Sequence, residues 1–249
     1  MIILKSPAEI EKMKAAGKIV AGALDGLRAV VRPGVTTAEL DAFAEDYIRG
    51  CGAVPAFKGY MGYPATVCAS INEEVVHGIP SRGRALKEGD IVGLDLGAVV
   101  DGYFGDAAIT VPVGEIAKEL RVLLDVTEAS LLKGIEKAIV GNRVSDISHA
   151  VQAYAESFGF SVVTDFVGHG IGRRLHEEPQ VPNFGPPGQG ARLKAGTTLA
   201  IEPMINMGTA HTVVLDDGWT AVTLDRRPSA HFEHTVAVTD DGPVILTAV

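Results

Sequence analysis

One order of elements occurs twice along the 249-residue chain: two amphipathic helices, followed by a series of short strand patterns. Residues 29–52 (AVVRPGVTTAELDAFAEDYIRGCG) and residues 138–159 (AIVGNRVSDISHAVQAYAESFG) share a pattern about 108 positions apart. A repeated unit of this kind indicates two related halves around a shared core. One matching pair of segments is weak evidence of duplication by itself. No linker rich in Pro, Gly or Ser separates the halves, so we expect one domain over residues 1–249, with halves at about 1–113 and 114–249.

Local signals place the helices. Residues 6–9 (SPAE) supply an N-cap, a proline at the first helical position and a glutamate that completes a capping box. Helical spacing of apolar residues continues from there to residues 32–34 (RPG), and residues 36–39 (TTAE) begin a second helix with another capping box. In the second half, we expect a long helix over Glu115–Val140 and a further helix capped by Ser145.

Composition and charge exclude several classes of protein. No run approaches the roughly 18 to 20 apolar residues of a membrane helix, and the N-terminal sequence MIILKSPAEIEKMKAAG lacks the pattern of a signal peptide. Two cysteines, Cys51 and Cys68, cannot form a disulfide framework and indicate reduced thiols in the cytoplasm. The net charge of −9 argues against nucleic acid as the main partner. An excess of acid also fits a site where bound cations neutralise carboxylates.

Two aspartates lie in the apolar segment IVGLDLGAVVDGYFGDAAITV. Asp95 and Asp106 are about equally far from a turn near residues 100–102 (VDG), so a hairpin would place them face to face across two strands. Aspartate is unfavourable within strands and is seldom buried without a partner. Two carboxylates at that distance repel unless they share a proton or a cation. The alternative is that one caps a turn and the other is exposed.

Three further polar residues interrupt strand-like segments of the second half. His169 lies between glycines in VGHGIG, Glu202 ends the apolar run LAIEPM, and Glu233 begins the run FEHTVAV. An isolated histidine is more often a core or surface residue than a ligand, and either glutamate could be a salt-bridged core acid.

Taken together, the five residues indicate a metal site. Two Asp, two Glu and one His form an oxygen-rich donor set, which suits a pair of divalent ions of the manganese, iron or cobalt type better than a structural zinc. The four carboxylates carry four negative charges, which two divalent cations balance. Such a pair activates water and polarises a carbonyl, as a hydrolytic aminopeptidase requires.

A set of short motifs runs in order along essentially the whole chain: VVHGIP (75–80), LDLG (94–97), GDAA (105–108), GHGIG (168–172), LHEEPQVPNFG (175–185), IEPM (201–204) and FEHT (232–235). Through these motifs the sequence resembles the type I methionine aminopeptidases of metallopeptidase family M24. The resemblance implies an α+β fold of the "pita-bread" type, in which two pseudo-symmetric halves of helices and antiparallel strands surround a dinuclear metal site.

The resemblance also implies roles for the five residues. Asp106 and Glu233 would bridge the two metal ions, Asp95 would bind one ion, and His169 and Glu202 would bind the other. The ions would be Co, Mn, Fe, Zn or Ni. Glu202 would in addition handle the proton of the attacking water.

Further residues gain roles only through the resemblance. His77 would contact the scissile peptide and His176 would stabilise the tetrahedral intermediate, although either could be an ordinary loop histidine. A pocket for the substrate methionine would be formed by Tyr60, Tyr63, Cys68, His77, Leu175, His176 and Trp219. An apolar slot of this composition suits a thioether, but the same residues could simply pack a core.

The chain departs from the family pattern at two pocket positions. Phe57 stands where many members have cysteine, and Leu175 where many have phenylalanine. Both keep the pocket apolar, so only its fine specificity is in doubt. Asn72, Glu74 (through its carbonyl) and Ser229 match a monovalent-cation site of the family.

The expected reaction is removal of the N-terminal methionine from nascent polypeptides whose second residue is small. We expect a cytoplasmic monomer that contacts the ribosome transiently and binds neither a membrane nor a specific nucleic acid. Rival interpretations are an Xaa-Pro peptidase of the same fold, a non-catalytic relative that binds nucleic acid or protein, and a metal-storage protein. Against the first, Xaa-Pro peptidases are typically longer chains. Against the second, non-catalytic relatives have typically lost metal ligands, and all five are present here. Against the third, a metal-storage protein needs no apolar pocket.

Overall fold

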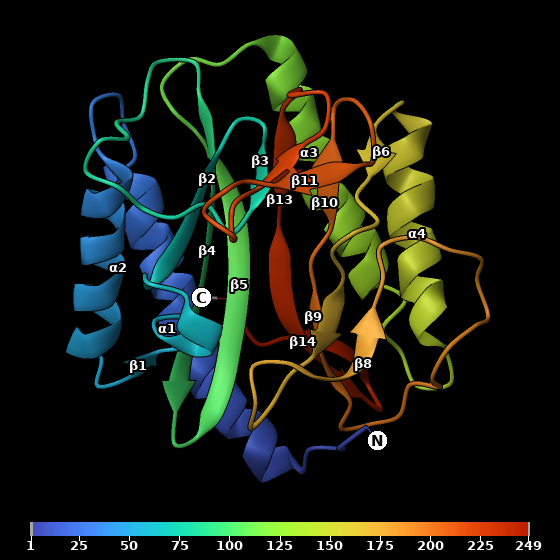
Figure 1. Cartoon of the computed structure of the whole chain (residues 1–249). Coiled ribbons are helices and arrows are strands. Elements are labelled where there is room, and N and C mark those ends of the chain that lie inside the picture. Colours follow the sequence, from blue (N-terminus) through green and yellow to red (C-terminus); the bar gives the residue numbers. More distant parts are fainter. Residues whose placement is uncertain (1, 249) are drawn as a thin grey trace.

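The computed structural model describes residues 2–248, and the predicted domain limits at residues 1 and 249 lie outside them (Figure 1). Its α-helices are α1 (Pro7–Val30), α2 (Thr37–Gly50), α3 (Lys118–Ile135) and α4 (Val144–Ser157). Both predicted capping boxes of the first half are confirmed. The hydroxyls of Ser6 and Thr36 accept the amide protons of Glu9 and Glu39, and the carboxylates of these glutamates accept the amide protons of Ser6 and Thr36.

The helices of the second half differ from the sequence prediction at their ends. α3 is shorter than Glu115–Val140, because the amides of Lys137 and Ala138 bond to carbonyls three residues back and form tight turns. Ser145 does not cap α4. The cap position is Arg143, and the Asp146 carboxylate accepts its amide proton at 2.7 Å. The Ser145 hydroxyl instead accepts the amide proton of Gln189.

The strands are short except for one long hairpin. In chain order, with the single turn of 3₁₀-helix η1 (Tyr60–Gly62) after the first, they are β1 (Val54–Pro55), β2 (Val67–Ile71), β3 (Glu74–Val76), β4 (Ile91–Val100), β5 (Tyr103–Pro112), β6 (Ser161–Val162), β7 (Gly168–Gly170), β8 (Glu177–Val181), β9 (Thr198–Ile201), β10 (Met204–Asn206), β11 (Thr212–Val214), β12 (Ala221–Thr223), β13 (Ser229–His231), β14 (Glu233–Thr239) and β15 (Gly242–Ile245).

One antiparallel sheet joins the two halves of the chain. Its main path runs β1-β4-β5-β14-β9-β7-β8, with β2 paired to β4 and β15 paired to β14. The halves meet where β5 pairs with β14, at Ala108 opposite Glu233 and Ala107 opposite His234. Two smaller sheets have the orders β13-β10-β6 and β11-β12-β3.

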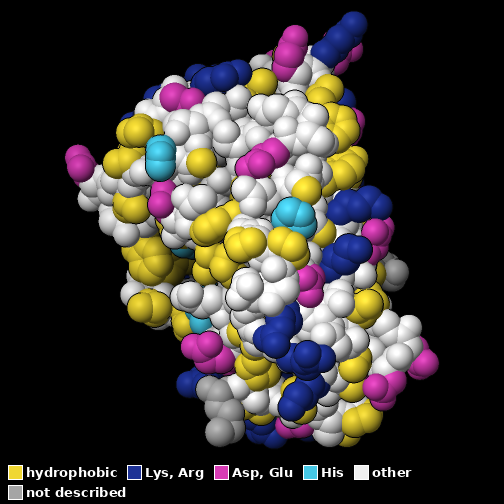
Figure 2. Space-filling view, turned by 90° about the vertical axis from the view of Figure 1, so that its right-hand side faces the viewer, with side chains coloured by type: hydrophobic (Ala, Val, Ile, Leu, Met, Phe, Trp, Pro, Cys, Tyr) yellow, Lys and Arg dark blue, Asp and Glu magenta, His cyan; other side chains and the backbone are white. Residues whose placement is uncertain are grey.

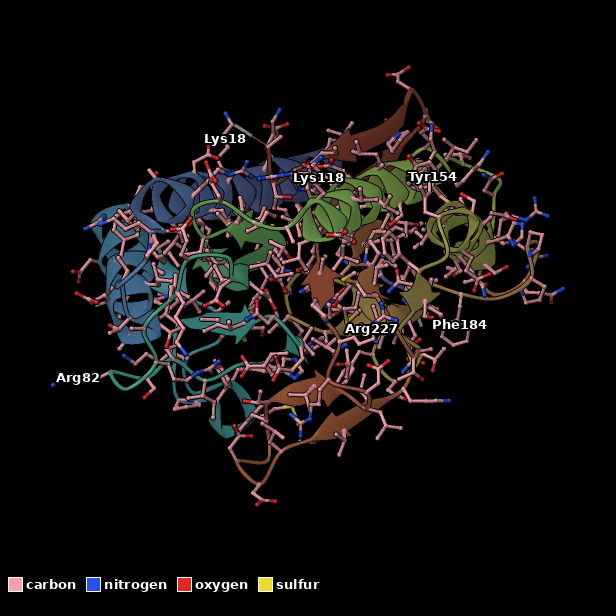
Figure 3. The ribbon with its side chains drawn as sticks, turned by 90° about the horizontal axis from the view of Figure 1, so that it is seen from above. Lys18, Arg82, Lys118, Tyr154, Phe184 and Arg227 are labelled. Carbon is pink, nitrogen blue, oxygen red and sulfur yellow. The ribbon has the colours of Figure 1, made fainter. Side chains whose placement is uncertain are left out.

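The helices lie together on one side of the large sheet. Figure 3 shows α1, which carries Lys18, and α3, which carries Lys118, along one side, with the β11–β12 hairpin on the opposite side. α1 packs on β4 and β5 in the first half, and α3 packs on α4 and on β9 and β14 in the second. Each half thus buries its own apolar cluster, and Ile109 of β5 contacts both.

Loops and the two small sheets cover the side of the large sheet that faces away from the helices. The 3₁₀ turn η1 and the segment between β7 and β8 lie at this side (Figure 1). In residues 2–248, none of the helices combines the length and the apolar character that a membrane crossing requires.

Candidate metal centre

The predicted hairpin forms, and its turn sets the positions of the two aspartates. Asp101 and Gly102 adopt positive φ and connect β4 to β5 through the pair Val100–Tyr103. In this register Asp95 pairs with Ala108, and Asp106 pairs with Gly97. The expectation that the aspartates lie directly opposite each other is therefore wrong. They occupy the same face as diagonal neighbours, two residues out of register, which still places both carboxylates at one site.

The second half brings its three polar residues to the same place. His169 on β7 pairs with Ala200 of β9, Glu202 follows the end of β9, and Glu233 begins β14. The His169 Nε2 atom lies 3.5 Å from Glu202 Oε1 and 4.0 Å from Asp106 Oδ2. One donor atom each from Asp106, His169 and Glu233 lies within 4.8 Å of the other two.

Hydrogen bonds fix the direction of these donors. His169 Nδ1 lies 2.9 Å from the carbonyl oxygen of Gly170. A carbonyl can only accept, so Nδ1 carries the proton and Nε2 presents its lone pair to the carboxylates. Thr235 holds the backbone of Asp106 from both sides, because its Oγ1 accepts the Asp106 amide proton and donates to the Asp106 carbonyl.

The electrostatics of the cluster favour a bound cation. Burial raises the pKa of Asp95 to about 7. The pKa of Asp106, Glu202 and Glu233 is raised well above the ordinary range, first by burial and then by the neighbouring carboxylates. Burial also lowers the pKa of His169 to about 3, so this ring is neutral and able to bind metal.

Unpaired oxygens point to the same conclusion. Within residues 2–248, buried oxygens of Asp95, Asp106 and Glu233 find no hydrogen-bond partner. A buried carboxylate oxygen without a partner costs free energy. A divalent cation would satisfy all of these oxygens at once, and the donor set suits such an ion.

A cavity of about 240 Å³ opens onto the carboxylate cluster. It is lined by every residue predicted for the metal site and the methionine pocket: Tyr60, Tyr63, Cys68, His77, Asp95, Asp106, His169, Leu175, His176, Glu202, Trp219 and Glu233, together with Phe57. Hydrophobic side chains gather along the left-hand side of Figure 2, which is the side that faces the viewer in Figure 1, and histidine rings are visible between them.

Aromatic contacts stiffen this cavity. The Tyr63 and Trp219 rings meet edge to face with centroids 5.1 Å apart, and the Tyr63 hydroxyl donates to the carbonyls of Val67 and Gly78. His77 adopts a positive φ of 62° and meets Phe166 edge to face at 5.6 Å. These ring contacts and hydrogen bonds therefore hold the side chains of the pocket wall in position.

His176 stands beside the carboxylate cluster. Its ring centroid lies 4.3 Å from that of His169, and its Nδ1 atom lies 2.8 Å from the Tyr60 hydroxyl. When the Tyr60 hydroxyl donates this bond, the proton of the neutral ring resides on Nε2, away from Tyr60. Burial lowers the pKa of His176 and keeps the ring neutral.

Some residues of the site were missed by the sequence prediction. His231 is buried, and its unpaired Nε2 lies 3.7 Å from Glu202 Oε2. His231 ends β13, and Glu233 begins β14 only two residues later, so its closeness in sequence to a predicted metal ligand was the available signal. Asn183 donates to the Glu202 carbonyl, and no local pattern indicated that contact. Five further residues complete the lining of the cavity: Met61, Val76, Phe166, Val167 and Met204.

Two residues of the predicted monovalent-cation site lie in contact. The Ser229 amide donates to the Asn72 carbonyl at 2.9 Å. The Glu74 carboxylate binds Arg84 at 2.6 Å and accepts the amide proton of Ile71. This leaves the cation site itself a prediction.

Comparison with known proteins identifies the family. Metallopeptidase family M24 matches residues 11–240. The chain is 55% identical over 247 residues to a methionine aminopeptidase of Clostridium acetobutylicum, covering 99% of both chains. It is 52% identical over 249 residues to methionine aminopeptidase 1 of Bacillus subtilis, covering all of both. The chain belongs to the methionine aminopeptidases of metallopeptidase family M24.

Solved structures of the family confirm the fold. A methionine aminopeptidase from Thermotoga maritima superposes over 100% of both chains with a TM-score of 0.99 at 50% identity. The predicted α+β pita-bread fold is thereby confirmed. Prolidase from Pyrococcus furiosus shares the fold with a TM-score of 0.78, at 23% identity and over 66% of its own length. The family fold thus includes the rival Xaa-Pro peptidases, and the high identity lies with the methionine aminopeptidases.

Proposed function

We propose that the chain removes the N-terminal methionine from polypeptides whose second residue is small. The observation that carries the proposal is that one cavity is lined both by apolar side chains, among them Tyr63, Leu175 and Trp219, and by the carboxylate cluster. A methionine side chain fits an apolar slot, and its amino group and scissile carbonyl then reach the cluster. A metal-storage protein has no use for such a slot, and a non-catalytic relative has no use for the complete donor set.

Two divalent ions of the Co, Mn, Fe, Zn or Ni type would be held by five residues. Asp106 and Glu233 would bridge the ions, Asp95 would bind one, and His169 and Glu202 the other. Support comes from the unpaired buried oxygens and from the neutral His169 ring. When bound, such ions polarise the substrate carbonyl and lower the pKa of the attacking water.

The remaining steps belong to side chains of the chain. The Glu202 carboxylate takes the proton of the attacking water and returns it to the leaving amine. The Nε2–H of His176 donates to the oxyanion, since the hydroxyl of Tyr60 occupies Nδ1. His77 lines the cavity and would contact the scissile peptide. The apolar pocket excludes water from the methionine side chain and orients the scissile bond.

Other expectations from the sequence belong to the same proposal. They are one catalytic domain over residues 1–249, a monovalent-cation site at Asn72, Glu74 and Ser229, and nascent chains as substrates. We further propose that the protein is a cytoplasmic monomer that contacts the ribosome transiently. The pairing of β5 with β14 across the two halves supports the single domain.

A peptide assay tests this function. Met-Ala-Ser should be cleaved in the presence of divalent metal, Met-Lys-Ser should not, and chelation should stop the reaction. Ala-Pro-Ala serves as the control for Xaa-Pro peptidase activity. Comparable kcat/KM for Met-Lys-Ser and Met-Ala-Ser would contradict the proposed specificity, and cleavage of Ala-Pro-Ala alone would contradict the methionine pocket.

A further inference from the structure

The segment from Gly172 to Glu177 connects β7 to β8 and presents Leu175 and His176 to the cavity. Few backbone bonds hold it: the Phe104 amide donates to the Gly172 carbonyl, and the Gly172 amide donates within the segment. His176 itself is exposed on its outer side. Such a segment needs anchors from outside if its two side chains are to keep their positions.

The Glu177 carboxylate supplies anchors from the C-terminal end of the segment. Its Oε1 atom accepts the amide protons of Arg173 at 2.9 Å and of Arg174 at 3.1 Å. The carboxylate therefore closes the turn that precedes Leu175 and His176. The geometry of the turn depends on where this buried carboxylate is held.

Lys5 holds the other oxygen of this carboxylate. The Lys5 Nζ atom lies 2.5 Å from Glu177 Oε2, and the two side chains are 4% and 3% exposed. The same Nζ donates to the Ile3 carbonyl, and the Lys5 amide donates to the Gly196 carbonyl at 2.7 Å. A buried ion pair is retained only when its geometry and its further hydrogen bonds offset the lost hydration, and both conditions are met here.

Two glycines make room for Lys5. A Cβ atom on Gly172 would lie 2.8 Å from Lys5 Nζ, and one on Gly196 would lie 2.6 Å from the Lys5 carbonyl oxygen. The Lys5 side chain therefore passes directly over Gly172, the last glycine of the GHGIG motif, to reach Glu177. The path of Lys5 explains why residue 172 is a glycine, which the proposed metal binding by His169 does not explain.

We propose that Lys5 is a positioning residue for the reaction, acting on His176 through Glu177 and the Arg173–Arg174 turn. The inference rests on the proposed function of His176. The N-terminal segment ahead of α1 is then part of the active-site scaffold, because it fixes the turn from which His176 reaches the oxyanion. Loss of the Nζ bond leaves a buried carboxylate without its cation, which releases the turn.

A double-mutant cycle with His176 tests the inference. Lys5→Met keeps the length of the side chain and removes the charge. We expect kcat for Met-Ala-Ser to fall at least tenfold, since small displacements of positioned groups are costly. In a His176→Ala background the same change should lower kcat less than twofold, because the group that Lys5 positions is gone. Equal fold-losses in both backgrounds would show that Lys5 acts on stability alone and would overturn the inference.

The control variant is Lys133→Met, which removes an exposed lysine paired with Glu136 on α3 and should leave kcat unchanged. Amide hydrogen exchange supplies a readout without catalysis: Arg173 and Arg174 should lose protection in Lys5→Met and keep it in Lys133→Met. If protection is unchanged in Lys5→Met, the inference is wrong. If His176→Ala alone keeps full activity, the proposed role of His176 fails instead, and the exchange data still decide the anchoring.

A second variant covers the case in which Lys5→Met does not fold. Lys5→Met/Glu177→Gln removes both charges of this pair and should fold, because it leaves no unpaired carboxylate at position 177. Its kcat should still fall, and the fall should again depend on His176. A folded double variant with kcat within twofold of wild type would overturn the inference.

Discussion

The Glu202 carboxylate lies between two imidazoles, with His169 Nε2 3.5 Å from one oxygen and His231 Nε2 3.7 Å from the other. Burial and the neighbouring acids raise its pKa well above the ordinary range. This shift applies to the metal-free site, and a bound cation would favour the ionised carboxylate again, while the two imidazoles set its direction. These are the properties that a general base requires.

Replacing Glu202 by Gln should nearly abolish turnover while the apolar pocket still binds methionine. The amide keeps the shape of the side chain and loses its charge and basicity. Steady-state kinetics on Met-Ala-Ser, with methionine binding measured by calorimetry, would check this. Loss of a general base costs roughly 10²-fold or more, so a variant that retains more than about a tenth of kcat would contradict the base role.

Replacing His176 by Ala should lower kcat far more than it raises KM. The bond that Nε2 donates strengthens as negative charge develops on the substrate oxygen, so it acts mainly in the transition state. Rate measurements over a range of peptide concentrations separate the two constants. A rise in KM alone would make His176 a binding residue.

At the scale of elements, α1 approaches β5 closely next to a proposed metal ligand. A Cβ on Gly105 would lie 2.7 Å from the Gly17 amide nitrogen and 3.0 Å from the Ala16 carbonyl carbon. Both contacts are to backbone, so neither can move aside alone. Gly105 directly precedes Asp106, so the backbones of α1 and β5 are in close contact beside a proposed metal ligand.

Gly105→Ala should destabilise the protein by about 1–3 kcal/mol, the usual cost of overpacking. For a chain of this size, each kcal/mol corresponds to a fall of about 2–4 °C in melting temperature. Gly50→Ala is the matched control. Gly50 ends α2 and a Cβ there meets nothing within 4 Å, so that variant should be as stable as wild type or slightly more stable. Equal melting temperatures for the two variants would count against close packing of α1 on β5.

At the scale of the whole molecule, folding brings acids from both halves into one buried cluster. Asp95 and Asp106 come from the β4–β5 hairpin, and in the second half Glu202 follows β9 and Glu233 begins β14. Without metal, the like charges lose hydration and repel. Repulsion between these carboxylates therefore opposes the folding of the two halves onto each other, while the shared sheet and the apolar clusters favour it.

Chelation should lower the melting temperature, and divalent metal should restore it. A ligand that binds only the folded state stabilises it by RT ln(1 + [M]/Kd), about 2.7 kcal/mol at 100-fold excess over Kd. Asp106→Asn should lose most of this stabilisation and its activity. Metal-free, however, Asp106→Asn should be as stable as wild type or more stable, because one repelling charge is gone.

The advantage of metal-free Asp106→Asn should grow with pH. The folded pKa of Asp106 is raised by burial above an unfolded value of about 3.9. Folding then takes up a proton above that pH, so the free energy of unfolding of wild type falls as pH rises. Thermal melts of both proteins with chelator, at several pH values, check this. A metal-free variant that melts well below wild type would mean that the carboxylate supports the fold through other bonds.

The sequence by itself placed the starts of α1 and α2, the β4–β5 hairpin and the residues that gather at the centre. Capping boxes and a tight turn are decided by residues within three or four positions, which is why Ser6, Thr36 and Asp101 were informative. Ser145 misled because its hydroxyl is taken by Gln189, far along the chain. The five acidic and imidazole groups were recognisable because such residues are out of place in apolar strands.

Only the tertiary structure decided how these groups face one another. It set Asp95 diagonal to Asp106, brought His231 to Glu202, and joined Lys5 to Glu177 across 172 positions of sequence. Each of these contacts depends on strand register or on packing between segments that are distant in the chain. No local propensity encodes a contact of that kind, because its free energy exists only once both segments are in place.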